Sequence, residues 1–179
     1  MEKLRTIYGD KAILRPITAE DTPLIVKWRN NPAVQHNFVF QQTFTNEMHN
    51  KWLETKVKTG EVVQYIIVDK AADTPVGSVY FRDIDNDNHS AEFGIFIGED
   101  IARGKGIGSE TTRLFCDMGF EDLALHRIML RVFSDNEQAK KSYLNAGFVL
   151  EGEFKDMVMQ NGAYRSMTFM AKIAPKQHD

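Results

Sequence analysis

A glycine-rich turn at residues 103–108 is the first segment whose spacing indicates chemistry. It reads Arg-Gly-Lys-Gly-Ile-Gly and lies between an apolar run at residues 93–97 and a segment with helical apolar spacing at residues 109–120. These neighbours predict a strand before the turn and a helix after it. Such a turn exposes backbone N–H groups at the positive end of a helix, where anions bind. The segment therefore predicts a site for a diphosphate group.

Two better-known glycine motifs do not fit this turn. A P-loop has Ser or Thr after its Gly-Lys pair and a glycine five residues before that pair, and neither condition holds at Gly104-Lys105. The dinucleotide fingerprint needs a third glycine where Ser109 stands. What remains is the pattern Arg103-x-x-Gly106-x-Gly108, which is compatible with phosphate binding or with an ordinary flexible loop.

A second segment, residues 134–148, adds a more specific pattern. The capping-box spacing of Ser134 and Glu137 predicts a helix that runs to Asn145, with Gly147 just beyond its end. Residues 127–132 before it have strand character. The segment has the form Asn-x-x-Ala-x-x-x-Tyr-x-x-x-Gly-Phe, from residue 136 to residue 148.

Together, the two patterns resemble the coenzyme A-binding turn and the following helix of the GCN5-related N-acetyltransferase (GNAT) superfamily. Residues 151–164 resemble the tail of its RimJ/RimL-type branch, which acetylates ribosomal-protein amino termini. The resemblance covers about residues 10–172. It implies an α/β fold, with a mixed, mostly antiparallel twisted sheet flanked by helices, and acetyl-CoA as the acetyl donor.

By this resemblance, the coenzyme contacts come from the turn, the strand before it and the second helix. The turn would hold the diphosphate, the strand backbone would pair with the pantetheine arm, and Asn136 would bind near the thioester. Lys140 or Lys141 could reach a further phosphate, although either is also an ordinary solvated lysine. The residues so assigned are Phe96, Ile97, Arg103, Gly104, Lys105, Gly106, Ile107, Gly108, Ser109, Asn136 and Lys141.

Acetyl transfer to an amine also needs an acid for the leaving thiolate and a neutral amine. Tyr143 is the candidate acid, and a core aromatic residue is the alternative interpretation. Glu92 is the candidate base because an isolated carboxylate in an apolar strand is costly to bury. A salt bridge from Glu92 to Arg82 or Arg127 is the alternative to a catalytic role.

The acceptor is expected near the aromatic segment of residues 33–45, which has no clear period. Substrate contacts are assigned to Trp28, Arg29, Phe38 and Phe40, with Arg29 available for an acidic or phosphorylated part of the acceptor. A protein amino-terminal α-amine or a small-molecule amine is favoured, since an α-amine titrates near about 8 and a lysine near about 10. A nucleotide-linked amino sugar, a polyamine and a noncatalytic acyl-CoA-binding sensor are the alternatives.

Composition bounds the function more loosely. The 179 residues predict one domain with a polar tail at 174–179, and a net charge of −3 without a basic stripe argues against nucleic acid. The single Cys116 excludes an intrachain disulfide framework and fits the cytoplasm. We expect no membrane partner, no metal site and a monomer or homodimer.

The chain must position these residues with short, regular elements. Turn signals and periodicity predict a helix from residue 18 that ends at Pro32, and helices at 46–58, 109–120 and 134–145. Strands are predicted at residues 3–8, 12–15, 62–69, 76–82, 90–97, 127–132, 148–159 and 164–173. Asn161-Gly162 predicts a tight hairpin between the last two strands.

Overall fold

A computed structural model describes residues 4–175 of the chain. Residue 3 of the first predicted strand and residues 176–179 of the predicted tail lie outside this range. Within it, the eight strands are β1 (Ile7–Tyr8), β2 (Ala12–Pro16), β3 (Val63–Asp69), β4 (Thr74–Asp85), β5 (Ser90–Ile97), β6 (Arg127–Phe133), β7 (Val149–Gln160) and β8 (Ala163–Ile173). They form one sheet in the order β1-β2-β3-β4-β5-β6-β8-β7.

Every strand pair is antiparallel except β5 with β6. That parallel pair is recorded at only three positions, from Ser90 opposite Arg127 to Glu92 opposite Met129. Beyond them, β5 continues to Ile97 on β4 alone, and β6 continues to Phe133 on β8 alone. The two strands therefore part in the middle of the sheet, and the predicted mixed, mostly antiparallel sheet is confirmed.

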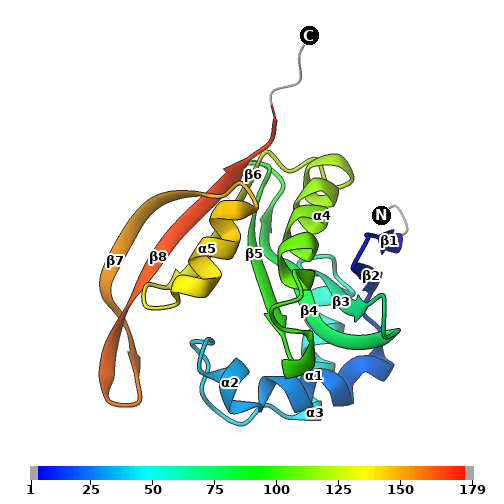
Figure 1. Cartoon of the computed structure of the whole chain (residues 1–179), viewed down its shortest axis with the longest axis horizontal. Helices are drawn as coiled ribbons and strands as arrows, with labels where there is room; N and C mark the ends of the chain where they lie inside the picture. The colour runs from blue at the N-terminus through cyan, green and yellow to red at the C-terminus, as the bar shows by residue number, and fades with distance from the viewer. Residues whose placement is uncertain (1–3, 176–179) are drawn as a thin grey trace.

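Helices cover the two faces of the sheet. Helices α4 (Ile107–Glu121) and α5 (Glu137–Asn145) contact each other, and Figure 1 shows them side by side in front of the strands. Helices α1 (Thr22–Arg29), α2 (Pro32–Gln35) and α3 (Asn46–Trp52) gather at the bottom of that view. A 3-10 turn at Ala19–Asp21 leads into α1, a π-helical turn at Leu53–Val57 extends α3, and a 3-10 turn at Asp100–Ala102 precedes the glycine turn.

Strand alternation divides the core into two clusters. The larger one packs α4 and part of α5 against residues such as Phe81 and Phe93. The smaller one packs α1 against Ile66, Val68 and Phe96 on the opposite face. Phe93 and Phe96 of β5 thus belong to different clusters, so β5 contributes side chains to both sides of the sheet.

One predicted helix start is wrong, and Pro32, predicted to end a helix, also begins the next one. Pro32 does more than end a helix, because it occupies the first turn of α2, where Asn31 caps it. Helix α5 is capped by Asn136, whose Oδ1 accepts from Ala139 N at 3.1 Å. The Ser134 hydroxyl instead lies 2.9 Å from Thr168 Oγ1 on β8, so Ser134 is not the capping residue that its sequence spacing predicts.

Cys116 lies fully buried on α4, as its place on the apolar side of that helix predicts. Burial raises the pKa of its thiol to about 12, so the thiol stays protonated and unreactive. Among residues 4–175, no helix is long and apolar enough to cross a membrane.

Candidate active site

One continuous cavity of about 1360 Å³ runs through the place where β5 and β6 part. On one side it is lined by the glycine turn and by the starts of α4 and α5. On the other side it is lined by α1, α3 and the segment between them. The backbone of β5 from Glu92 to Ile97 lies along the cavity between these two sides. The arrangement joins the glycine-capped start of α4 to a second, aromatic compartment.

The glycine turn has the geometry that its sequence predicts. Gly106 caps α4 with φ of 82°, a left-handed conformation in which a side chain would be strained. Gly108 differs, because a Cβ built there has only Ile97 Cγ1 within 4 Å, at 3.9 Å. The protein itself therefore leaves room at Gly108 on the cavity wall. Ser109 Oγ lies 3.0 Å from Ser142 Oγ and links the starts of the two helices.

The strand residues assigned to the pantetheine arm face in two directions. The Phe96 carbonyl oxygen is 2.2 Å from a Cβ built on Gly77, so it points toward β4. The Ile97 carbonyl instead accepts from Arg103 Nη2 at 3.2 Å. Ile97 lies opposite Gly77 in the β4–β5 register, and both Phe96 and Ile97 line the cavity. Their pairing with the pantetheine arm therefore stays a prediction.

Two of the assigned cations differ in where they point. Lys105 does not line the cavity, because its Nζ lies 3.4 Å from Asp69 Oδ2. Lys141 does line it, whereas Lys140 Nζ donates to the Ser134 carbonyl at 2.6 Å and to Glu137. The Lys105 side chain therefore lies outside the cavity lining. Of the two helix lysines, Lys141 rather than Lys140 faces the cavity.

Tyr143 lines the cavity from α5. Its ring packs against Phe93 and Phe148, with centroids 6.2 Å and 5.9 Å away. Burial raises the pKa of the phenol, so the hydroxyl stays protonated across the neutral range. Tyr143 is thus both a core aromatic residue and a protonated group facing the cavity, so the two interpretations from sequence are not exclusive.

Glu92 is held by two arginines at the point where β5 and β6 part. Its Oε1 accepts from Arg82 Nη2 at 2.8 Å and from Arg131 Nε at 3.1 Å, and its Oε2 accepts from Arg131 Nη2 at 2.8 Å. Arg127, the other expected partner, pairs with Glu151 instead. The ion-pair interpretation is therefore present in the structure, with Arg82 as one of the two expected partners.

The acceptor side differs from its prediction at one residue. Arg29, Phe38 and Phe40 line the cavity. Trp28 does not, because it is 0% exposed in the smaller core cluster and its Nε1 donates to Glu99 Oε1 at 2.7 Å. The predicted substrate contact of Trp28 is wrong for this structure, and its role is packing.

Three further lining residues were not singled out from the sequence. Tyr80 faces Gly94 across β4 and β5, and its ring fills the space that a Cβ at Gly94 would need, with Cζ at 2.3 Å. Arg131 follows Met129, the last β6 residue paired with β5. His49 is 1% exposed and lies on α3. A large residue opposite a glycine in a predicted hairpin could have indicated Tyr80 from the sequence. The partners of Arg131 and His49 depend on tertiary contacts, which no local pattern predicts.

A parted strand pair beside a glycine-capped helix terminus, with one cavity joining both faces of the sheet, defines the class of acyl-CoA N-acyltransferase folds. The family model of the GNAT acetyltransferase domain matches residues 11–149. The chain therefore belongs to the GNAT family and is an acetyl-CoA-dependent N-acetyltransferase.

Its relatives act on more than one kind of amine. Spermidine N(1)-acetyltransferase of Escherichia coli K12 is 28% identical, over 86% of this chain and 81% of that protein. The spermidine N-acetyltransferase of Vibrio cholerae, solved with CoA and spermine, has a TM-score of 0.86 at 24% identity, over 92% of this chain and 96% of that one. The ribosomal-protein-S5-alanine acetyltransferase of Vibrio fischeri has a TM-score of 0.82 at 25% identity, over 94% and 96%.

Proposed function

We propose that this enzyme transfers an acetyl group to a weakly basic primary amine, namely a protein amino-terminal α-amine or a small-molecule amine. The observation that carries the proposal is the cavity that joins the α4 terminus to an arginine-rich aromatic compartment. Nearby positive charges disfavour an ammonium group, and an α-amine with a pKa near about 8 loses its proton far more readily than a lysine. A polyamine is the second candidate, supported by the spermidine acetyltransferases among the relatives.

The coenzyme is assigned to the α4 side of the cavity. Backbone N–H groups of residues 106–109 would hold its diphosphate, with positive charge from Arg103 and Lys141. The Ile97 backbone would pair with its pantetheine arm, and an N–H of β5 would donate to the acyl oxygen as negative charge develops there. Bound acetyl-CoA supplies the thioester. Asn136 already caps α5, so its contact with the coenzyme would come from its amide nitrogen, now 3.1 Å from Asn37 Oδ1.

Gly108→Ala tests the phosphate cradle. The position has helical geometry and room for a methyl group on the protein side, so the variant should be at least as stable as the parent. Coenzyme A binding should nevertheless weaken roughly tenfold, a loss of about 1.4 kcal/mol, because the methyl group stands where the diphosphate approaches. Calorimetry with coenzyme A measures this.

Gly119→Ala would be an unsuitable control, because a Cβ there meets Phe81 at 2.8 Å. Gly152→Ala is better matched, since a Cβ there has no neighbour within 4 Å and β7 is remote from the helix terminus. Unchanged affinity for coenzyme A in a folded Gly108→Ala protein would refute the assignment of the diphosphate to this turn.

Glu92→Gln tests how the amine is deprotonated. Since both oxygens of Glu92 already accept from arginines, we expect the carboxylate to order Arg82 and Arg131. The variant should lower kcat/KM roughly tenfold while the rising limb of its pH profile stays at the same pH, because that limb then belongs to the acceptor amine. Steady-state rates from about pH 6 to pH 9 measure this, and loss of the limb would make Glu92 the base.

The setting of the enzyme is also part of this proposal. A single buried cysteine suits a reducing compartment, and we propose a cytoplasmic enzyme that is a monomer or homodimer. Its function is tested by free-thiol release from acetyl-CoA in the presence of single amines. Release that depends on an amine, with the acetylated amine identified by mass spectrometry, is expected. Coenzyme binding without thiol release for any α-amine, sugar amine or polyamine would favour the noncatalytic sensor.

A further inference from the structure

The acceptor compartment holds more positive charge than its own carboxylates balance. Seven basic residues line the cavity, namely Arg29, Lys51, Lys56, Arg82, Arg103, Arg131 and Lys141, and Glu92 is the one acidic residue among the described lining residues. Arg103 and Lys141 lie on the coenzyme side. The other five lie on the acceptor side, where Lys56 pairs with Glu61 and Arg82 with Asp83, two carboxylates outside the cavity lining.

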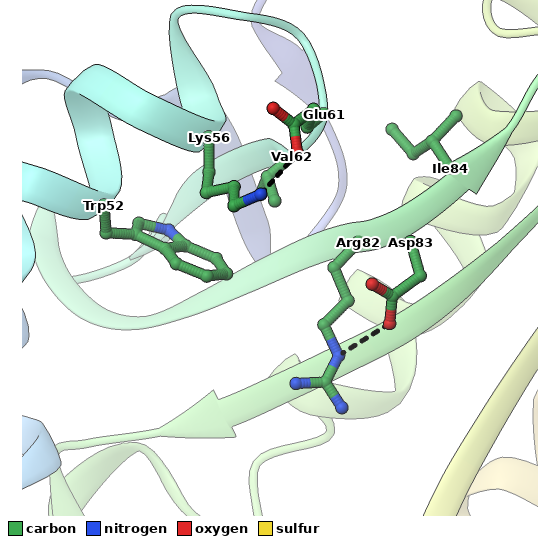
Figure 2. A pocket seen from close by; sticks show the side chains of 7 residues that line it. All are labelled: Trp52, Lys56, Glu61, Val62, Arg82, Asp83 and Ile84. Carbon is green, nitrogen blue, oxygen red and sulfur yellow. Dashed lines mark hydrogen bonds and ion pairs between the residues drawn. The ribbon is translucent and has the colours of Figure 1, made fainter.

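Arg82 and Arg131 have acidic partners, but Arg29 has none among residues 4–175. Glu92 binds both of the former. Asp83 Oδ2 lies 3.7 Å from Arg82 Nε, and Figure 2 draws this ion pair in a smaller cavity that is also lined by Arg82. Arg29 Nε is buried without a hydrogen-bond partner. Burial lowers the pKa of Arg29, and no nearby carboxylate offsets that cost. Arg29 thus combines a buried, unpaired Nε with the lack of an acidic partner among residues 4–175.

Unpaired buried polar atoms gather at this one cavity. Within the described part of the chain, five buried side-chain nitrogen or oxygen atoms have no partner. Three of the five, Arg29 Nε, Arg82 Nε and His49 Nε2, belong to residues that line the cavity. Buried polar groups in proteins are nearly always paired with protein or water, and Arg82 Nε already lies 3.7 Å from Asp83 Oδ2. Among residues 4–175, Arg29 Nε is therefore the buried cationic atom of this cavity with neither a hydrogen-bond nor an acidic partner.

Two aromatic rings fix the orientation of Arg29. Its Cζ lies 3.6 Å from the ring centroid of Phe38 and 4.9 Å from that of Phe44. A guanidinium stacked on rings keeps its in-plane N–H groups for other partners, and that fork matches the two oxygens of a carboxylate or phosphate. The side chain is therefore preorganised, so binding an anion costs little additional entropy.

Arg29 also lies close to the strand that would meet the acetyl group. The Phe38 ring that stacks on Arg29 is 5.6 Å from the Phe96 ring of β5, centroid to centroid. Only the Phe38 ring separates the guanidinium from the Phe96 ring of β5. An amine placed there can carry an anionic group only a few bonds away and still reach Arg29.

We propose that the acceptor carries an anionic oxygen group, a carboxylate or a phosphate, close to its amine, and that Arg29 binds this group. The proposal rests on the acetyltransferase function proposed above and names the class of acceptor. It disfavours spermidine-like polyamines as acceptors, because a polycation would meet five basic side chains, of which Arg29 has no acidic partner among residues 4–175. The same positive charges favour the neutral form of the acceptor amine.

The test compares acceptors that differ only in the anionic group. The pairs are an amino acid with its α-carboxamide, an amino-terminal aspartyl dipeptide with its asparaginyl counterpart, and phosphoethanolamine with ethanolamine. Spermidine is added as the polycation. We expect kcat/KM of the wild-type protein to favour the anionic member of at least one pair roughly tenfold to a hundredfold. The preferred pair distinguishes carboxylate from phosphate.

Arg29→Met then connects the preference to the residue. Methionine keeps an apolar stem beside Phe38 but removes the fork, so the ratio between the two members of the preferred pair should fall to within about threefold. Arg29→Lys should recover part of the ratio, since it restores the charge without the bidentate geometry. Lys27→Met is the matched control on the same helix. Lys27 is exposed, pairs with Glu99 and does not line the cavity, so its ratio should equal that of the wild type.

Two results would overturn the proposal. One is equal use of the anionic and neutral members in every pair by the wild-type protein, or a preference for spermidine. The other is a preference that Arg29→Met leaves intact in a protein that still binds coenzyme A. Both require acetylation of some amine, so they are distinct from the absence of any thiol release, which would instead refute the proposed function itself.

Discussion

Tyr143→Phe is expected to reduce kcat by roughly 10²–10⁴-fold, the range that general acid catalysis contributes. The hydroxyl would protonate the departing thiolate, so its loss acts in the transition state and should leave the KM for acetyl-CoA nearly unchanged. Burial raises the pKa of the phenol, so Tyr143 keeps its proton through neutral pH. Ionisation of Tyr143 should therefore cause no loss of kcat at any pH up to about 10. Steady-state kinetics at saturating acceptor measures the loss.

The fold should tolerate this change. The Tyr143 ring packs edge to face on Phe93 and beside Phe148, and phenylalanine keeps both contacts. Tyr164→Phe is the matched control, since Tyr164 is 64% exposed on β8 and outside the cavity. A loss in kcat below about threefold for Tyr143→Phe would fall well short of the expected range and would assign the acid elsewhere.

Trp28→Ala is expected to be the most destabilising of the substitutions considered. Trp28 is fully buried, its ring lies where a Cβ at Gly98 would be only 2.1 Å away, and its Nε1 is bonded to Glu99. Removing such a side chain typically costs about 3–5 kcal/mol, which lowers Tm on the order of 10 °C for a domain of this size. Thermal unfolding followed by circular dichroism measures this.

Two further variants separate packing from acceptor binding. Trp28→Phe keeps most of the buried volume and should recover more than half of the lost stability. Phe40→Ala removes a ring that is 37% exposed and lines the cavity, so it should raise the acceptor KM with a small effect on Tm. An unchanged Tm for Trp28→Ala, together with a higher acceptor KM, would restore Trp28 to the acceptor site.

Much of the fold could be predicted because its signals are local. Asn161 and Gly162 both have positive φ, at 52° and 78°, which is the backbone that a tight hairpin requires of an Asn-Gly pair. Gly106 similarly takes the left-handed conformation at the start of α4. The alternation along β5 predicted that Glu92, Gly94 and Phe96 share a face, and their register with Arg82, Tyr80 and Ser78 agrees.

The errors come from contacts between segments far apart in the chain. Glu92 pairs with Arg131 because β5 and β6 lie side by side for three residues and then part, and no local pattern reports that divergence. Trp28 and Arg29 are adjacent on α1, yet one packs into the core and the other faces the cavity. Their shared aromatic and basic character suggested one role for both, and only the packing of α1 on the sheet separates them.

A crystal structure of the complex with coenzyme A tests the central claim most directly. We expect the diphosphate to bind the backbone N–H groups of residues 106–109. The pantetheine arm should pair with Ile97 where β5 and β6 part. We further expect the thiol within hydrogen-bonding reach of the Tyr143 hydroxyl, at about 3 Å or through one water. A diphosphate bound away from the α4 terminus, or a thiol on the far side of the sheet from Tyr143, would contradict the account.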